Sequence, residues 1–186
     1  MGRAFRLMLF WLAAAWCGNA QQADTGVVIA SFEAGGLFGI GAHGSVGGSL
    51  AVPQSQHLVP FVDFSYSPLS SYAYTYGVND TGKALYRSHL IDFNGGLRIR
   101  FPNKSDWVPY IGLGAGVLHV ASSDNLSGFS TTETINASRN EFAGNASVGA
   151  LYYVNQHVGF GMEVKGYGAQ HNGFVRATAQ VFYQFP

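Results

Sequence analysis

Charged side chains are scarce in this sequence of 186 residues, because lysine, arginine, aspartate and glutamate together make up only 11% of it. A typical soluble domain carries about 25%. Low charge is typical of a chain that faces lipid, yet no stretch after residue 20 approaches the ~18 continuous apolar residues that a membrane helix needs. An apolar composition without apolar helices favours strands as the elements that meet the lipid.

Cysteine and surplus positive charge are also lacking. The single cysteine, Cys17, lies near the N-terminus, so no disulfide can stabilise the rest of the chain. Ten basic side chains balance ten acidic ones, whereas a nucleic-acid-binding protein is expected to carry a basic surplus. These absences exclude a disulfide scaffold and argue against nucleic acid as a partner.

The first 20 residues have the composition of an export signal. Two arginines precede an apolar run at 7–16, and small residues follow up to Ala20. A basic start, a short apolar stretch and small residues before the cleavage point are the pattern of a secretory signal peptide. We therefore predict a signal peptide at 1–20 and one mature domain at 21–186.

Two other interpretations of this N-terminal segment are a membrane-anchoring helix and a lipidated N-terminus. The apolar run is about half the length that a spanning helix requires. Acylation would use Cys17, but such sites want a small residue just before the cysteine, and Trp16 stands there. Cleavage after Ala20 fits the sequence better than either.

The most informative pattern is the alternation of apolar and polar residues, because successive side chains of a strand point to opposite faces. Near the C-terminus, Val175 and Val181 lie on an apolar face, while Arg176 and Gln180 lie on a polar one. The same period recurs in seven further segments, which predicts eight strands. The candidate strands lie at 30–35, 42–52, 62–67, 91–101, 110–117, 142–154, 158–165 and 174–185.

The connections between these segments are sorted by length. Three of them, at 53–57, 102–106 and 155–157, are short and polar, whereas 69–85 and 122–140 are long and rich in Ser, Thr, Asn and Gly. Short turns on one side and long loops on the other are typical of outer-membrane barrels, and a soluble sandwich has no reason to sort its loops in this way. We expect the short turns and both chain ends in the periplasm.

The first of the two long connections also contains an alternating, tyrosine-rich stretch at 70–76. The alternation indicates strands that extend beyond the bilayer. Tyrosines at such a rim suit an aromatic girdle at the membrane surface better than a recognition site, although both uses are known.

Two motifs resemble a known family. The segment 109–116, PYIGLGAG, resembles the PYxGxGxG strand of the small outer-membrane β-barrels that include the transmembrane domain of OmpA. The closing segment 181–185, VFYQF, resembles the aromatic-ended last strand that the barrel-assembly machinery recognises, with Tyr183 and Phe185 as the assembly signal, although Pro186 follows here. The resemblance implies an eight-stranded antiparallel transmembrane barrel in the bacterial outer membrane, and it implies no reaction.

The polar face of the expected strands carries eight charged residues. An eight-stranded barrel is only wide enough for side chains to fill it, and an isolated ion there would cost several kcal/mol. We therefore predict a paired charge network that plugs the interior, with a narrow conducting path as the alternative. The network residues are Glu33, Asp63, Asp92, Arg98, Arg100, Glu163, Lys165 and Arg176.

Catalytic and metal-binding patterns are weak. His43 and Ser45 share one strand face, which faintly resembles barrel lipid A deacylases, but the rest of that motif is missing and the phase points both residues inward. No pair of histidines has convincing metal spacing. We expect no enzyme, cofactor or metal.

The sequence thus favours a structural or surface-interaction barrel. Its expected partners are outer-membrane lipid, the barrel-assembly machinery and an extracellular ligand bound through 69–85 and 122–140, and we expect a monomer. The alternatives are a lipid-modifying barrel enzyme, a narrow pore, and a soluble lipocalin-like carrier, which would need an apolar interior.

Overall fold

The computed structural model describes residues 27–39, 42–76, 82–127, 133–169 and 173–185. The expected signal peptide at 1–20 and Pro186 lie outside these ranges. Eight strands occupy the described chain. They are β1 (Val28–Phe38), β2 (His43–Ala51), β3 (Leu58–Tyr76), β4 (Gly82–Arg100), β5 (Trp107–Ser127), β6 (Glu133–Tyr153), β7 (Val158–Ala169) and β8 (Gly173–Phe185).

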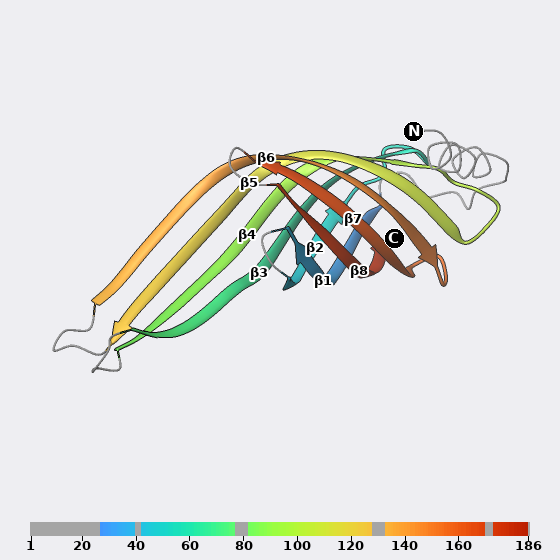
Figure 1. Ribbon diagram of the computed structural model, residues 1–186. Helices are drawn as coiled ribbons and strands as arrows, with labels where there is room; N and C mark the ends of the chain where they lie inside the picture. Colours follow the sequence, from blue (N-terminus) through green and yellow to red (C-terminus); the bar gives the residue numbers. More distant parts are fainter. Residues whose placement is uncertain (1–26, 40–41, 77–81, 128–132, 170–172, 186) are drawn as a thin grey trace, which may run out of the picture.

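The strands form one closed antiparallel barrel (Figure 1). Each strand pairs with the next in the sequence, and β8 closes the barrel against β1 from Val28↔Phe185 to Phe38↔Val175. Closure removes the exposed sheet edges that would otherwise leave backbone groups unpaired in lipid. Within the described ranges, no helix is long and apolar enough to cross a membrane. The fold predicted from the alternation is confirmed.

The alternation separates an apolar exterior from a polar interior. Large apolar side chains such as Phe32, Leu113 and Met162 are exposed on the outer face. Charged side chains such as Glu33 and Lys165 are buried inside. This is the arrangement of a barrel that faces lipid, and it is the reverse of the apolar interior that a lipocalin-like carrier needs.

Four strands are much longer than the sequence predicted. The segments 69–85 and 122–140 were expected to be loops, but β3 continues to Tyr76, β4 starts at Gly82, β5 continues to Ser127 and β6 starts at Glu133. Outside a bilayer both faces of a hairpin meet water, so its strands need no alternation of apolar and polar residues. Their sequence then resembles that of a loop. The alternating stretch at 70–76 was the one sign of this extension, and it lies in β3.

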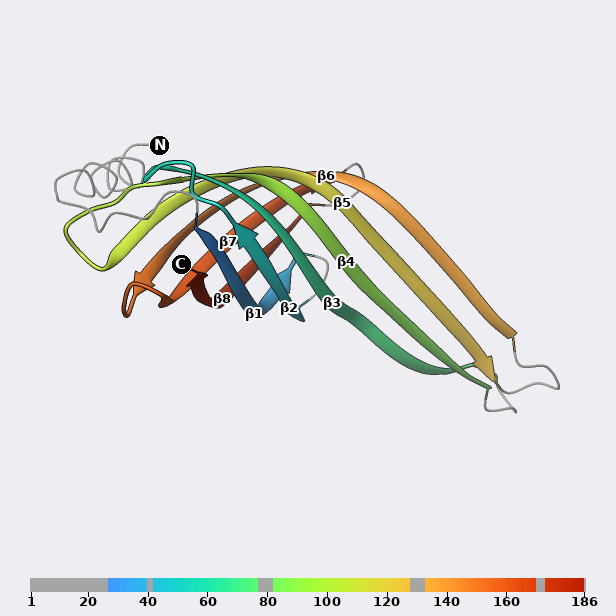
Figure 2. The ribbon, with the colours of Figure 1, turned by 180° about the vertical axis from the view of Figure 1, so that it is seen from behind.

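The two long hairpins project beyond the rest of the barrel at one end (Figures 1 and 2). The pairing of β2 with β3 ends at Val46↔Tyr66, and that of β6 with β7 ends at Ala143↔Ala169. Beyond these points β3, β4, β5 and β6 form a four-stranded sheet, which we call the projecting sheet. The short turns at 52–57, 101–106 and 154–157 lie at the opposite end.

Candidate functional site

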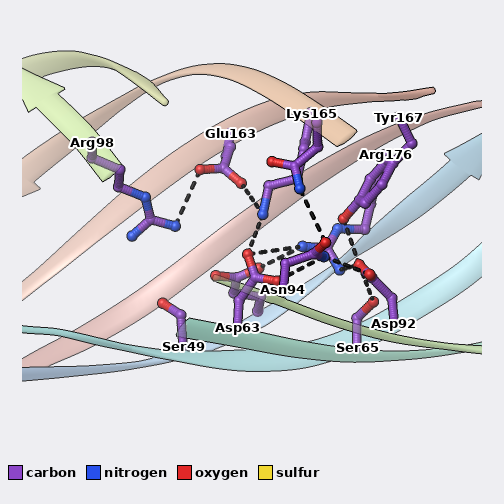
Figure 3. A network of polar contacts seen from close by, with 12 residues as sticks. Ser49, Asp63, Ser65, Asp92, Asn94, Arg98, Glu163, Lys165, Tyr167 and Arg176 are labelled. Carbon is purple, nitrogen blue, oxygen red and sulfur yellow. Dashed lines mark hydrogen bonds and ion pairs between the residues drawn. The ribbon is translucent and has the colours of Figure 1, made fainter. Parts of the chain in front are cut away.

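The barrel interior is the most densely polar part of the described structure. Inward positions on β1, β3, β4, β7 and β8 supply the charged side chains predicted from the sequence, because every second residue of these strands points into the lumen. Glu141 on β6, which the sequence analysis did not include, is buried as well and forms an ion pair with Arg139. Figure 3 shows six of the eight charged residues predicted from the sequence gathered in one network, and Glu33 joins it through Arg176.

Lys165 on β7 lies at the centre of the network. Its ammonium group forms an ion pair with Asp63 on β3, across the lumen. It also lies 3.1 Å from Glu163 Oε1 on its own strand. Glu163 Oε2 in turn accepts a hydrogen bond of 3.1 Å from Arg98 on β4. These contacts join three strands that are not all neighbours in the sheet.

Arg176 on β8 holds a second group of carboxylates. Its Nη2 lies 3.5 Å from Glu33 Oε2 on β1, and its Nη1 lies 3.5 Å from Asp92 Oδ2 on β4. Asp63 Oδ2 is 3.9 Å from the same guanidinium and links this group to Lys165. One arginine on the last strand therefore contacts acids from the first, third and fourth strands.

Neutral side chains that the sequence analysis did not include complete the network. Asn94 Nδ2 donates hydrogen bonds to Asp63 Oδ1 at 3.2 Å and to Asp92 Oδ1 at 2.5 Å. Asn145 Nδ2 donates to Asn94 Oδ1 at 3.0 Å. Tyr167 donates to Asp92 Oδ2 at 2.6 Å. An amide between two carboxylates reduces their mutual repulsion, and the alternation placed Asn94 inward without indicating this role.

Two further hydrogen bonds extend the network toward the turn end of the barrel. Tyr110 donates to Glu163 Oε2 at 2.9 Å, and Gln180 Nε2 donates to the Tyr110 hydroxyl at 3.3 Å. The Arg98 guanidinium lies over the rings of Phe61 and Tyr110, with its Cζ 4.5 Å and 5.1 Å from their centroids. Cation–π contacts of this kind add to the stability of a desolvated cation.

Arg100 lies apart from the other seven charged residues. It is buried near the short turns, where its Nη1 donates to the Tyr153 hydroxyl at 3.3 Å. The described contacts give it no carboxylate partner. Arg100 was predicted as a member of the network from its inward phase, and the structure places it inward but outside the paired cluster.

Apolar layers enclose the network at both ends. The layer at the turn end consists of Ile29, Ala51, Val59, Phe61, Val108, Tyr110, Leu151 and Phe182. The layer toward the projecting sheet consists of Leu37, Leu90, Leu118, Ala143, Tyr167 and Phe174. Buried side chains therefore lie on both sides of the charges, as in a barrel whose interior is filled by side chains.

The residues considered for catalysis do not face the lipid. Ser45 is buried in the interior, and His43 is partly buried on the same face of β2. A barrel enzyme that acts on membrane lipid needs its nucleophile and base where lipid can reach them. Within the described ranges, no group of three His, Cys, Asp or Glu side chains could hold a metal ion.

The two predicted assembly residues lie on the outer face of β8. Tyr183 and Phe185 are both exposed, and their rings meet edge to face with centroids 4.9 Å apart. His157, in the turn before β7, stacks on Tyr183 at 6.1 Å and places its Nδ1 3.1 Å from the Gln184 carbonyl. The last strand thus presents an aromatic surface beside the short turns.

Comparisons with known proteins agree with this geometry. No known family model matches the sequence. A stretch of 60 residues is 42% identical to the outer membrane protein PagN of Salmonella typhimurium. This stretch is 31% of the present chain and 25% of PagN, so the similarity spans about a quarter of that relative.

Solved structures of low sequence identity share the fold. A major outer membrane protein from Thermus thermophilus matches with a TM-score of 0.59 at 12% identity, over 85% of this chain and 99% of that one. Ail of Yersinia pestis, in complex with the heparin analogue sucrose octasulfate, matches with a TM-score of 0.55 at 8% identity, over 87% of this chain and 100% of that one. The closed eight-stranded barrel with its apolar exterior thus has the fold of the small β-barrels of the bacterial outer membrane.

Proposed function

We propose that the protein is a non-catalytic, closed barrel that holds the projecting sheet outside the cell as an interaction surface. The observation that carries this proposal is the difference in strand length. β7 and β8 have 12 and 13 residues, close to the ~9–11 that cross a bilayer, whereas β5 and β6 have 21 each. About nine residues of extended strand reach ~30 Å, so the hairpins extend well past the lipid.

The packed interior supports a structural rather than a conducting role for the barrel. Seven of its charges are paired or hydrogen-bonded between two apolar layers. A buried ion pair adds little net stability over an apolar core, but it penalises any rearrangement that separates the partners. The barrel is then a rigid base, and recognition belongs to the hairpins.

The ligand class comes from the comparison with Ail, whose structure contains a heparin analogue. We extend this to the present chain as a proposal that a sulfated saccharide binds the outer end of the projecting sheet. The remaining parts of the proposal are a mature domain at 21–186, a monomer surrounded by outer-membrane lipid, and assembly through Tyr183 and Phe185. The exposed aromatic surface of β8 supports the assembly role.

The proposal is tested by shortening the hairpins in register. Ser71 pairs with Arg87, and Ser122 pairs with Ala137, so a two-residue turn can join each pair without shifting the strands below. We expect the shortened protein to keep a compact band on unheated gels, because the interior network is untouched. It should lose binding to immobilised heparin.

The control for this experiment keeps both long hairpins and changes the other end of the barrel. Replacing the turn at 102–106 with a two-residue turn alters the short-turn end only. If this control loses heparin binding while the shortened hairpins keep it, the interaction surface lies at the opposite end and the proposal is wrong.

A further inference from the structure

On the outward face of β5 and β6, apolar residues give way to polar ones between two adjacent rows of paired residues. The last apolar row consists of Phe93, Val117 and Phe142, which are 58%, 46% and 67% exposed. In the next row, His119 Nδ1 lies 2.6 Å from Asn140 Oδ1, and Ile91 pairs with His119. Apolar side chains this exposed need lipid around them, so the row of His119 and Asn140 marks the upper boundary of the hydrocarbon layer.

A groove of about 430 Å³ lies directly above this boundary on the same strands. It occupies the two following rows of outward residues, and the described residues that line it include no acidic side chain. The outward lining consists of Arg87, His89, Ala121, Ser123, Asn136 and Ser138. One permanent cation, one histidine and several hydroxyl and amide groups thus converge on one hollow.

This set of groups fits an anionic, hydroxyl-rich ligand. A guanidinium presents parallel N–H donors that match two phosphate oxygens. Serine hydroxyls and the asparagine amide can donate to or accept from sugar hydroxyls. With no carboxylate in the described lining, nothing there repels an anion. The chemistry therefore points to a phosphorylated sugar.

The position of the groove indicates where that sugar comes from. His89 lies beside Tyr66, with ring centroids 5.9 Å apart, and Tyr66 is exposed on the outer face of the barrel. The groove therefore opens sideways, at the height where lipid headgroups begin, rather than upward over the barrel mouth. A headgroup anchored in the leaflet is held at this height by its own acyl chains, which raises its effective concentration at the groove.

We propose that this groove binds the phosphorylated sugar headgroup of the glycolipid that forms the outer leaflet around the barrel. The proposal rests on the proposed function only in placing the projecting sheet outside the cell. It adds a lateral lipid site to the base of that sheet, distinct from recognition at its tip. A bound headgroup would hold the base of the sheet against the membrane surface.

The test uses the full chain refolded into phosphatidylcholine nanodiscs that contain diphosphorylated lipid A. Retained lipid is measured by native mass spectrometry after competition with increasing phosphatidylcholine. The variant is Arg87→Gln with His89→Gln, which removes the guanidinium and the imidazole and leaves polar side chains in their place. We expect its lipid A retention to be about tenfold weaker than that of the unmodified protein, from the loss of charge-assisted hydrogen bonds.

The matched control is Lys104→Gln, which removes one exposed positive charge at the short-turn end. It should change lipid A retention by less than about twofold, as is usual for a surface substitution. Heat-modifiable gel mobility checks that both variants are folded. Equal retention in the double variant and the unmodified protein would overturn the proposal, as would an equal loss in Lys104→Gln.

A second pair of probes separates lipid from soluble sugar. Dephosphorylated lipid A should be retained no better by the unmodified protein than by the double variant, because the phosphate is absent. If instead the double variant keeps lipid A and loses only sucrose octasulfate, the groove serves a soluble anionic sugar and the lipid assignment is wrong. Failure of heparin binding after hairpin shortening would leave this result unaffected, since the two experiments read different ligands.

Discussion

At the scale of single residues, the interior depends on neutral groups as much as on charges. Asn94 donates to two carboxylates, Asp63 and Asp92, that would otherwise repel each other. Tyr110 and Tyr167 each donate to one acid from the apolar layers on either side. These side chains connect the charged centre to the apolar ends, so the lumen is one continuous packed unit.

The ion pair between Asp63 and Lys165 gives the first residue-scale prediction. Asp63→Asn keeps the shape of the side chain but removes the charge opposite Lys165. Breaking one partner of a buried pair typically costs ~3–5 kcal/mol in the free energy of unfolding. Urea unfolding in phospholipid vesicles, followed by gel mobility, measures this loss.

The double variant Asp63→Asn with Lys165→Met is the control for that loss. It removes one charge of each sign and leaves Glu163 paired with Arg98. It should therefore be more stable than the single variant. Additive destabilisation in the double variant would show that the two residues are not energetically coupled.

Glycines on one strand give a second residue-scale prediction. A Cβ at Gly149 on β6 would lie 2.5 Å from the Met162 carbonyl oxygen and 2.5 Å from the Tyr110 ring, so the glycine leaves room for both. Gly149→Ala should destabilise the barrel by ~1–3 kcal/mol through overpacking. Gly144→Ala on the same strand is the matched control, because its Cβ would meet no atom within 4 Å. Equal effects of the two changes in vesicle unfolding would refute this explanation.

At the scale of strands, the outer face of β7 and β8 defines the lipid contact. Val164 and Val181 lie outward near the middle of these strands, and both are about half exposed. The strands are short enough that the bilayer covers most of their length. Their apolar residues are therefore sites where water and charge are excluded.

Val164→Arg and Val181→Arg test this orientation. Each change should cost ~2–4 kcal/mol near the bilayer midplane, measured as the shift in unfolding free energy in vesicles. Val154→Arg, in the turn between β6 and β7, is the control and should cost little. If both strand variants unfold like the unmodified protein, the outward face does not lie in lipid.

At the scale of the whole molecule, a packed lumen predicts a barrel without steady conductance. Planar bilayers that contain the purified protein should show no sustained open-channel current, whereas a general porin in the same bilayers should. The physical reason is that charged and apolar side chains fill the cross-section. Persistent currents from the folded protein would contradict the closed interior.

Much of this architecture was predictable from the sequence, and the features that were not predicted have physical causes. Alternation gave eight strands and the inward phase of residues such as Glu163, because burial on one face imposes the two-residue period. Apart from the alternating stretch at 70–76 in β3, the long hairpins were not predicted, because strands in water need no such period. The sequence also did not predict which charges pair. Asp63 contacts Lys165 across the lumen, from a strand that is not its neighbour. Only the closed barrel determines which residues face each other.

The distribution of the eight predicted interior charges along the chain has a consequence for the order of assembly. The first four strands contribute three acids and two bases, and the last four contribute one acid and two bases. Neither set is electrically neutral by itself, and Arg176 on the last strand meets Glu33 on the first only when the barrel shuts. A half-inserted chain would leave Arg176 and Glu33 without each other, so we expect insertion and closure to occur as one cooperative event.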